Sequence, residues 1–416
     1  MDSALQGFYK LSVSERRKKL AELAKLDAEE VKLLEKFGAL DEPTANRMIE
    51  NVVGSYSLPL GIATNFKING KDYLIPFAIE EPSVVAAASN GAKIARAGGG
   101  FRTSSDEPVM IGQIQLVGVK NENEALKLIA ERRHDLLKMA EAVDPTLKKY
   151  GGGPVGLEVK KLKGPRGTLV LVHLLVNVAD AMGANAVNTM CEKLAPELEQ
   201  LTEGKVRLRI ISNLATKRLA RAEAVFPKSI LGEDLIEGIL DAWALAAADP
   251  YRAATHNKGT MNGIDAVVIA TGNDWRAVEA GAHAYAAFNR SYEPLTCYHK
   301  NAKGDLVGEI ELPLAVGIVG GATKTHPLAQ LCIKLLGVKN ARELAEIIAA
   351  VGLAQNFAAL RALAGEGIQR GHMQLHARNI AVMAGAKGKQ IDEIAKKMAE
   401  EKNVKVSRAK ELLEAK

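Results

Sequence analysis

Strand-like and helix-like segments follow one another in a distinctive order between residues 110 and 212. Alternating or continuous apolar residues predict four strands, and 3.6-residue periodicity predicts two helices. The strands are Met110–Val119, Gly156–Leu162, Thr168–Val178 and Val206–Ser212, and the helices are Glu122–Ala142 and Ala181–Leu201. The order β-α-β-β-α-β is that of the split βαβ unit in ferredoxin-like domains. We therefore predict an α+β protein in which a small ferredoxin-like domain, residues 108–213, is inserted into a larger domain.

The larger domain is expected to comprise residues 1–107 and 214–367. Two strand-like segments, Leu58–Phe66 and Lys71–Ile79, meet at Asn69-Gly70, which is a strong hairpin signal. Glu81-Pro82 then begins a helix, because proline is tolerated in a first helical turn and an acid favours the positive end of a helix.

The second part of the larger domain is rich in predicted helices. Asp234–Ala248 carries an apolar stripe with alanines on its other faces, which predicts a central helix. Further elements are a strand at Leu312–Val319 and helices at Leu328–Leu336, Ala341–Val351 and Ala354–Ala364. Charged helices with few apolar residues follow, and they predict a separate C-terminal helical flap, residues 368–416, with little core of its own.

Composition narrows the class of protein. A chain of 416 residues is long enough for two or three domains with substantial cores. It shows no run of about 18 apolar residues and no basic-then-apolar N-terminus, so we expect no membrane span and a cytoplasmic location. Three widely spaced cysteines support neither a disulfide frame nor a metal site. A net charge of +6 suits a polyanionic ligand such as a dinucleotide or coenzyme A, and dispersed Lys and Arg argue against nucleic acid.

The segment Asp180-Ala-Met-Gly-Ala-Asn185 is the best candidate for a dinucleotide site. No Gly-x-Gly-x-x-Gly follows a strand and no Walker loop is present, so neither a Rossmann domain nor a P-loop is predicted. Small residues in a first helical turn let a phosphate approach the free backbone N–H groups there. The alternative is an ordinary helix start on which Asp180 is the N-cap.

Lys258 lies in the segment Thr255-His-Asn-Lys-Gly-Thr-Met-Asn-Gly263, whose amides and glycines predict a loop. An apolar run, Ala266–Ala270, is expected to be buried beyond it. Asp274 follows at the start of the next predicted helix, where an N-cap is its ordinary role.

Four segments together resemble the HMG-CoA reductase family, and more closely its shorter class II members. They are the Lys258 segment, Glu80-Glu81-Pro82-Ser83, Asp180–Asn185 and Gly371-His372-Met373, and with their order they extend the resemblance over essentially the whole chain. The resemblance implies reduction of (S)-HMG-CoA to mevalonate and coenzyme A by two NAD(P)H, through mevaldyl-CoA hemithioacetal and mevaldehyde, or the reverse.

The resemblance also implies catalytic roles. Lys258 would neutralise negative charge on the substrate carbonyl oxygen, and Glu81 would protonate that oxygen. Asp274 would orient Lys258, and His372 would protonate the departing coenzyme A thiolate from a mobile tail. Taken singly, Glu81 and Asp274 are equally explained as helix-start acids, and His372 with His376 as a core or surface pair.

Binding residues carry over in the same way. The family contacts the hydroxymethylglutaryl group at the positions of Ser83, Asn213, Arg252 and Asn262. Arg252 suits a carboxylate because its fork binds one bidentately, and an ion pair with Asp249 is the alternative.

The nicotinamide cofactor would lie on Asp180, Met182, Gly183, Ala184 and Asn185 of a non-Rossmann domain. Asp144 favours NADH, because a carboxylate binds the ribose diol and repels a 2′-phosphate. Arg132, Arg133 and Lys148 lie close enough in sequence to accommodate the phosphate of NADPH instead.

The resemblance implies an obligate homodimer with active sites between subunits, where Glu81 and Lys258 come from one chain and the cofactor from the partner, and many bacterial members are trimers of dimers. We expect both features here. Two other functions stay open: a different CoA-linked oxidoreductase, which would not need Arg252 or Ser83, and a basic, non-catalytic interaction protein, which would be indifferent to Lys258→Ala.

Overall fold

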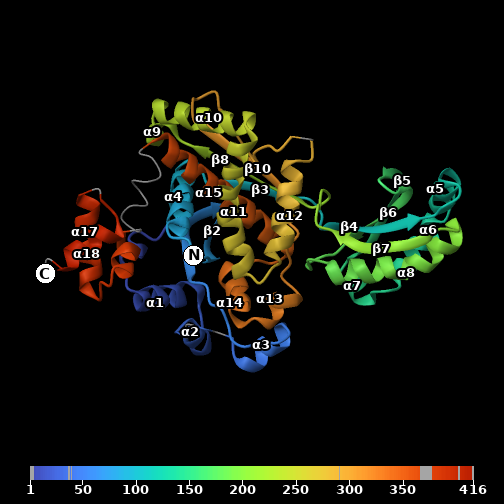
Figure 1. Cartoon of the computed structure of the whole chain (residues 1–416), viewed down its shortest axis with the longest axis horizontal. Helices are drawn as coiled ribbons and strands as arrows, with labels where there is room; N and C mark the ends of the chain where they lie inside the picture. Colours follow the sequence, from blue (N-terminus) through green and yellow to red (C-terminus); the bar gives the residue numbers. More distant parts are fainter. Residues whose placement is uncertain are drawn as a thin grey trace.

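The structure is a computed structural model that describes residues 4–35, 38, 40–289, 291–365, 377–401 and 403–414. Its strands form two sheets, one of six strands in the order β2-β1-β3-β8-β10-β9 and one of four in the order β5-β6-β4-β7. The larger sheet lies in the central body of the molecule, and the smaller one forms a separate lobe beside it (Figure 1). The predicted α+β class is confirmed.

The smaller sheet has the topology that the sequence predicts. Its strands are β4 (Val109–Val117), β5 (Gly153–Gly164), β6 (Gly167–Asn177) and β7 (Lys205–Ser212), and every neighbouring pair is antiparallel. The apolar sides of its strands and helices form one core around Ile114, Val172 and Leu194. The helices are α5 (Glu122–Glu131), α6 (Arg133–Glu141), α7 (Pro145–Lys149) and α8 (Ala184–Thr202).

Two details of this lobe differ from the prediction. The expected helix at Glu122–Ala142 is divided into α5 and α6 at Arg132. Helix α8 begins at Ala184 rather than Ala181, because Gly183 has a positive φ of 100° and sets the helix start. The domain boundaries near 108 and 213 stay predictions.

The larger sheet begins with the predicted hairpin. Strands β1 (Leu60–Ile68) and β2 (Lys71–Ala78) are antiparallel, and Asn69 and Gly70 have φ of 47° and 81°, as a type I′ turn requires.

Its other strands were mostly missed or misplaced. They are β3 (Phe101–Ser105), β8 (Leu219–Phe226), β9 (Thr296–Lys300) and β10 (Leu306–Pro313). The strand predicted at Leu312–Val319 is wrong beyond its first two residues. Strand β8 carries three alanines, which have low strand propensity, and so gave no signal.

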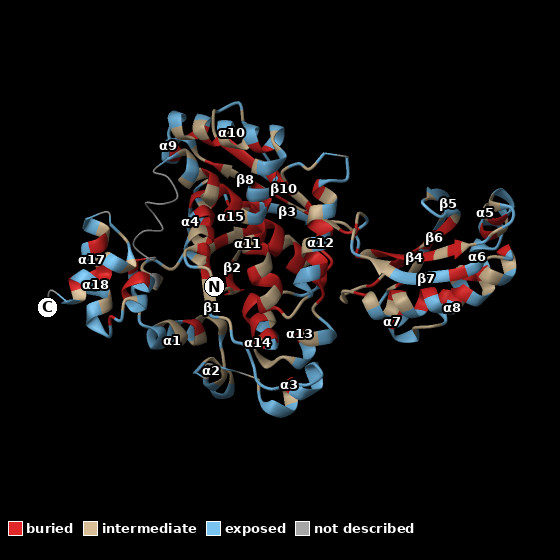
Figure 2. Cartoon of the chain, in the orientation of Figure 1, coloured by how far each residue is buried: buried red, intermediate tan, exposed pale blue. Residues whose placement is uncertain are grey.

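Two helices, α11 (Pro250–Ala270) and α15 (Ala341–Ala364), form the centre of the larger body, with α4 (Val84–Ala97) packed beside them. They approach closely at Gly263, where a Cβ would lie 2.9 Å from the Cβ of Gln355. Buried residues are concentrated in these helices (Figure 2). The prediction of a central helix at Asp234–Ala248 is wrong, because α10 (Glu233–Ala248) buries only Ile236, Ile239 and Ala246.

Helix α15 spans both predicted segments 341–351 and 354–364 without a break. By length and composition it is the one described helix that could cross a membrane, but it is a core helix, since 67% of its apolar window is buried in the protein.

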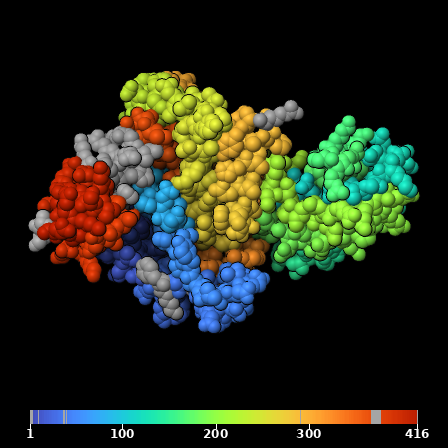
Figure 3. Space-filling view, viewed as in Figure 1, coloured from blue at the N-terminus to red at the C-terminus, as the bar shows by residue number. Residues whose placement is uncertain are grey.

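The remaining helices cover the body or form the C-terminal end. They are η1 (Phe8–Lys10), α1 (Val13–Ala24), α2 (Ala28–Glu35), α3 (Glu42–Met48), α9 (Lys228–Leu231), α12 (Trp275–Ala286), α13 (Gly321–Thr325), α14 (Pro327–Leu336), α17 (Lys389–Glu400) and α18 (Val406–Glu414). Ser12 caps α1 in a capping box with Glu15. The C-terminal helices have an apolar cluster of their own around Ile394, Met398 and Leu412, and they lie at the opposite end of the molecule from the smaller sheet (Figure 3).

Candidate active site

Lys258 lies in the middle of helix α11, so the predicted loop is wrong. The helix begins with Asp249, whose carboxylate accepts a hydrogen bond from the Arg252 N–H at 2.8 Å, and with Pro250 at the first position. Its asparagines do not break it because their side chains have hydrogen-bond partners on neighbouring elements, and Gly263 allows the close approach of α15. Asn257, for example, donates to the Glu293 carbonyl and accepts from the Leu295 N–H, both at 2.9 Å.

The structure brings Lys258, Glu81 and Asn262 together. Lys258 Nζ donates to Glu81 Oε2 at 2.9 Å, and Asn262 Nδ2 contacts the same oxygen at 3.4 Å. Lys258 and Asn262 are one helical turn apart and share a face of α11, while Glu81 comes from the segment between β2 and α4. The pair is open to solvent in one chain, since the side chains of Lys258 and Glu81 are 61% and 36% exposed.

Ser83, two residues after Glu81 in the chain, has a hydroxyl without a hydrogen-bond partner among the described residues. It precedes α4 in the left-handed region, at φ 76°, and its side chain does not cap the helix. Its Oγ is buried and has no hydrogen-bond partner among the described residues. A buried hydroxyl without a partner is costly, so this group is suited to a ligand.

Asp274 does not contact Lys258 within one chain. It is the N-cap of α12, where Oδ1 accepts from the Ala277 N–H at 3.1 Å, and it lies 3.6 Å from Arg276. The helix from Lys258 to Ala270 alone covers roughly 18 Å along its axis. Its capping role is therefore confirmed, and its predicted place beside Lys258 is not found in the single chain.

The other predicted substrate residues are more scattered. Arg252 is half-buried and lies six residues before Lys258, roughly 120° around the helix. Asp249 caps the helix with a backbone bond, and no Arg252–Asp249 ion pair occurs among the described residues. Asn213 is exposed just after β7, with its carbonyl oxygen against Gly281 of α12. His372 lies outside the described residues.

The segment Asp180–Asn185 differs from its predicted arrangement at Asp180. That side chain does not cap α8; its Oδ1 accepts from the Ala341 N–H at 2.8 Å, at the start of α15. Gly183 is the N-cap of α8 and offers no side chain, so the first-turn N–H groups of Ala184 and Asn185 are not covered by one. Gly183 is required here, because a Cβ would lie 2.4 Å from Val178 Cγ1.

Arg218 anchors this segment and was missed by sequence reasoning. It is buried, and its Nη1 donates to the carbonyls of Ala181 at 3.1 Å and Met182 at 3.3 Å, while Nη2 donates to that of Val316. Burial lowers the pKa of Arg218 to about 10, and the charge of Asp180 acts in the opposite direction. The guanidinium therefore fixes the segment against the residues that follow β10. No periodicity or motif in the sequence marks it.

Asp144 is the N-cap of α7, with Oδ1 accepting from the Leu147 N–H at 2.8 Å. Asp144 is half-buried and begins a helix, and its predicted contact with the ribose stays a prediction. The nearby cations are engaged elsewhere: Arg132 pairs with Asp135 and Glu197, and Lys148 pairs with Glu141.

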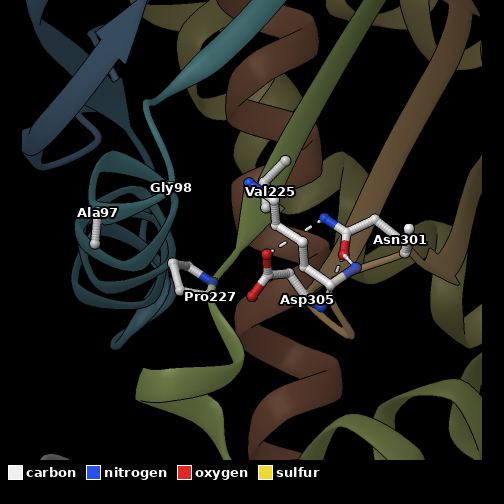
Figure 4. A pocket seen from close by; sticks show the side chains of 8 residues that line it. Ala97, Gly98, Val225, Pro227, Asn301 and Asp305 are labelled. Atoms are coloured by element: carbon white, nitrogen blue, oxygen red, sulfur yellow. Dashed lines mark hydrogen bonds between the residues drawn. The ribbon is translucent and has the colours of Figure 1, made fainter.

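A separate hollow of about 480 Å³ lies between α4, β8 and the turn after β9 (Figure 4). Its main polar groups bond to one another, since Asn301 and Asp305 exchange hydrogen bonds and Asp305 also accepts from the Lys228 N–H. None of the predicted site residues lines it. Among the described residues no group of His, Cys, Asp and Glu has the arrangement of a metal site.

A family model described as hydroxymethylglutaryl-coenzyme A reductase matches residues 12–377. The chain belongs to the HMG-CoA reductase family. The family model thus covers Glu81, Ser83, Lys258 and the Asp180–Asn185 segment in one continuous match.

Similar proteins support the family assignment over the full length. A 3-hydroxy-3-methylglutaryl-coenzyme A reductase from Archaeoglobus fulgidus is 58% identical over 100% of this chain and 95% of its own. A probable HMG-CoA reductase from Borreliella burgdorferi is 37% identical, over 80% of this chain and 77% of its own. The chain is thus an NAD(P)-dependent oxidoreductase that acts on HMG-CoA.

Solved structures of the family have the same fold. The HMG-CoA reductase of Streptococcus pneumoniae has a TM-score of 0.84 at 42% identity, over 99% of both chains. A class II structure from the same organism, bound to NADPH in open conformations, has a TM-score of 0.84 at 44% identity, over 86% of this chain and 99% of that one. The resemblance to class II reductases is confirmed.

Proposed function

We propose that the Lys258–Glu81 pair is the catalytic centre at which this chain reduces HMG-CoA to mevalonate. The observation that carries the proposal is the contact of Lys258 Nζ and Asn262 Nδ2 with one oxygen of Glu81. Ser83, two residues along the chain from Glu81, adds a buried hydroxyl without a partner among the described residues. A cation and an acid held together suit a carbonyl whose oxygen gains negative charge and then a proton.

The roles divide according to chemistry. Lys258 stabilises the developing charge on the thioester oxygen and, later, on the aldehyde oxygen. Glu81, in its acid form, gives that oxygen its proton, and Asn262 holds the carboxyl group in place. Ser83 and Arg252 bind the hydroxymethylglutaryl group, the latter at its carboxylate. His372 protonates the coenzyme A thiolate, a role carried over from the family alone.

The nicotinamide cofactor fits the start of α8. The first-turn N–H groups of Ala184 and Asn185 have no side-chain cap, and the positive end of the helix favours a pyrophosphate. Asp180 and Met182 hold the segment through Ala341 and Arg218, so the site is formed before a ligand arrives. Each cofactor molecule bound there would supply one hydride, and the reaction uses two such molecules in turn.

We also propose that the site is completed by a second copy of the chain. Asp274 is exposed and lies far from Lys258 in one chain, and Lys258 itself is largely open. A symmetric dimer that placed Asp274 of the partner subunit against Lys258 would orient the ammonium and exclude water from it. The trimer of dimers, the cytoplasmic location and the mobile flap stay predictions.

NADH is proposed as the preferred cofactor because Asp144 offers a carboxylate near the expected ribose. One oxygen of Asp144 caps α7, which leaves the second for a diol. The Streptococcus pneumoniae structure contains NADPH, so the preference needs a direct test.

We expect HMG-CoA-dependent oxidation of both cofactors, with a higher kcat/KM for NADH. Equal or higher kcat/KM with NADPH would contradict the preference, and no HMG-CoA-dependent oxidation would contradict the function.

The variant Asp144→Ser tests whether the Asp144 carboxylate sets the cofactor preference. Serine keeps the N-cap and removes the charge. We expect the kcat/KM ratio of NADPH to NADH to rise by roughly tenfold, with a change in melting temperature of only a few degrees. A ratio unchanged from that of the wild type would show that Asp144 is only a cap.

A further inference from the structure

A second set of titratable groups lies beside the catalytic helix. Asp265 is on α11, seven residues and nearly two full turns after Lys258, and therefore on the same stripe. Its carboxyl group is hydrogen-bonded to Glu279 of α12. Glu279 Oε2 accepts from His283 Nε2 at 2.6 Å, and His283 Nδ1 contacts the Tyr292 hydroxyl at 2.7 Å.

The group extends from the protein interior to its surface. Asp265 Oδ1 is buried and has no partner among the described residues. Glu279 is less accessible than His283, whose side chain is 39% exposed. At its inner end Asp265 is three residues from Asn262, so their Cβ atoms lie about 5–6 Å apart on one face of the helix. Asn262 contacts Glu81.

The protonation states favour one excess proton on the inner carboxyl. Burial raises the pKa of Asp265 to about 9, and the hydrogen bond with Glu279 acts in the same direction. The hydrogen bond from His283 lowers the pKa of Glu279, and the same bond raises the pKa of His283. Near neutral pH the expected state is a neutral Asp265 and an anionic Glu279, and the hydrogen bond with Glu279 favours the protonated form of His283.

Several charged groups on the neighbouring elements are paired with other residues. Helix α15 meets α11 at Val351 and Gln355, which are uncharged. On β10, Glu311 is bound by Tyr285 and Arg221. The remaining pairs are Lys71 with Glu343 and Asp72 with Arg96 on β2, Lys334 with Glu30 on α14, and Arg276 with Asp274 on α12.

We propose that Asp265, Glu279 and His283 form a proton relay that restores the proton of Glu81 after it has been given to the substrate oxygen. The Asp265 O–H breaks, and its proton passes beside Asn262, through one water molecule, to the Glu81 carboxylate. Asp265 then takes a proton from His283 through Glu279, and His283 takes one from solvent. No electrons are transferred along the relay, and one proton enters for each one that Glu81 delivers. The inference rests on the proposed role of Glu81.

The decisive variant is Asp265→Asn, which keeps a donor to Glu279 and cannot release a proton. We expect kcat for HMG-CoA reduction to fall by roughly 10²-fold. KM for HMG-CoA and NADH should stay within about twofold, and the solvent isotope effect on kcat should increase, because proton delivery becomes limiting. The carboxylic acid C=O band of the wild type at pH 7 should be missing from the infrared spectrum of the variant.

A matched control is Glu343→Gln, since Glu343 is likewise a half-buried carboxylate with a hydrogen-bond partner, but it accepts from Tyr73 and lies on another helix, α15. It should keep the wild-type kcat and the carboxylic acid band. An Asp265→Asn enzyme with wild-type kcat and pH profile would overturn the relay, as would a wild type without that band. A changed melting temperature and KM with an unchanged pH profile would also overturn it. Failure of the proposed catalytic centre is distinguishable, because Glu81→Gln would then keep the wild-type kcat.

Discussion

Lys258 and Asp265 lie on one stripe of helix α11 in opposite environments. Lys258 is an exposed cation with a carboxylate partner at 2.9 Å, whereas Asp265 is an enclosed acid whose pKa is raised to about 9. A raised acid pKa means that the folded protein binds this proton more tightly than the unfolded chain does. Its contribution to folding stability is therefore present at low pH and is lost as the pH rises from about 4 towards 9.

This linkage predicts a difference between wild type and Asp265→Asn. Urea midpoints measured at pH 6, 7, 8 and 9 should fall more steeply for the wild type, because asparagine cannot ionise and carries no such dependence. The raised pKa of His283 also contributes stability that is lost as the pH rises. Because both proteins contain His283, this contribution should largely cancel in the comparison. Parallel curves would mean that Asp265 is already ionised in the folded protein.

At the scale of elements, the crossing of α11 and α15 depends on glycine at one point. A Cβ on Gly263 would lie 2.9 Å from Gln355 Cβ and 3.1 Å from Val351 Cγ1, whereas a Cβ on Gly259 of the same helix would meet nothing within 4 Å. Gly263→Ala should therefore be less stable than Gly259→Ala by about 1–3 kcal/mol, because the helices must separate. Gly259→Ala should gain up to about 1 kcal/mol from helix propensity. Equal unfolding free energies from guanidinium titration would show that the crossing is not tight.

The same helix explains where the sequence misleads. Asn257, Gly259, Asn262 and Gly263 have the composition of a loop, yet they lie in a helix. Tertiary contacts of the two asparagines and the close approach of α15 at Gly263 account for three of them, and nothing in the structure requires glycine at 259. The hairpin at Asn69-Gly70 and the order of the smaller sheet were predictable because their signals are local. The meeting of Glu81 with Lys258 was inferred only through the family resemblance, and Arg218 and Asp265 gave no signal because burial of a single charged residue leaves no periodic trace.

At the scale of the whole molecule, one chain holds two incomplete parts of a site. Lys258 and Asn262 meet Glu81 on one face of α11. Asp274 lies beyond the C-terminal end of that helix, at the start of α12. The surface of α11 and α12 is open in the single chain (Figure 3). The chain shares its fold with the Streptococcus pneumoniae reductase over 99% of both chains. Under the proposal above, association of subunits completes the site.

The most direct test is the activity of mixed dimers. Lys258→Ala and Asp274→Ala should each lower kcat by about 10²–10³-fold alone. When the two variants are co-expressed with different tags and purified as mixed dimers, one site of two is intact, and we expect about half of the wild-type rate. Mixed dimers of Lys258→Ala with Glu81→Gln are the control and should stay inactive, since both residues act from one chain. Inactive mixed dimers of Lys258→Ala with Asp274→Ala would contradict a catalytic centre shared between subunits.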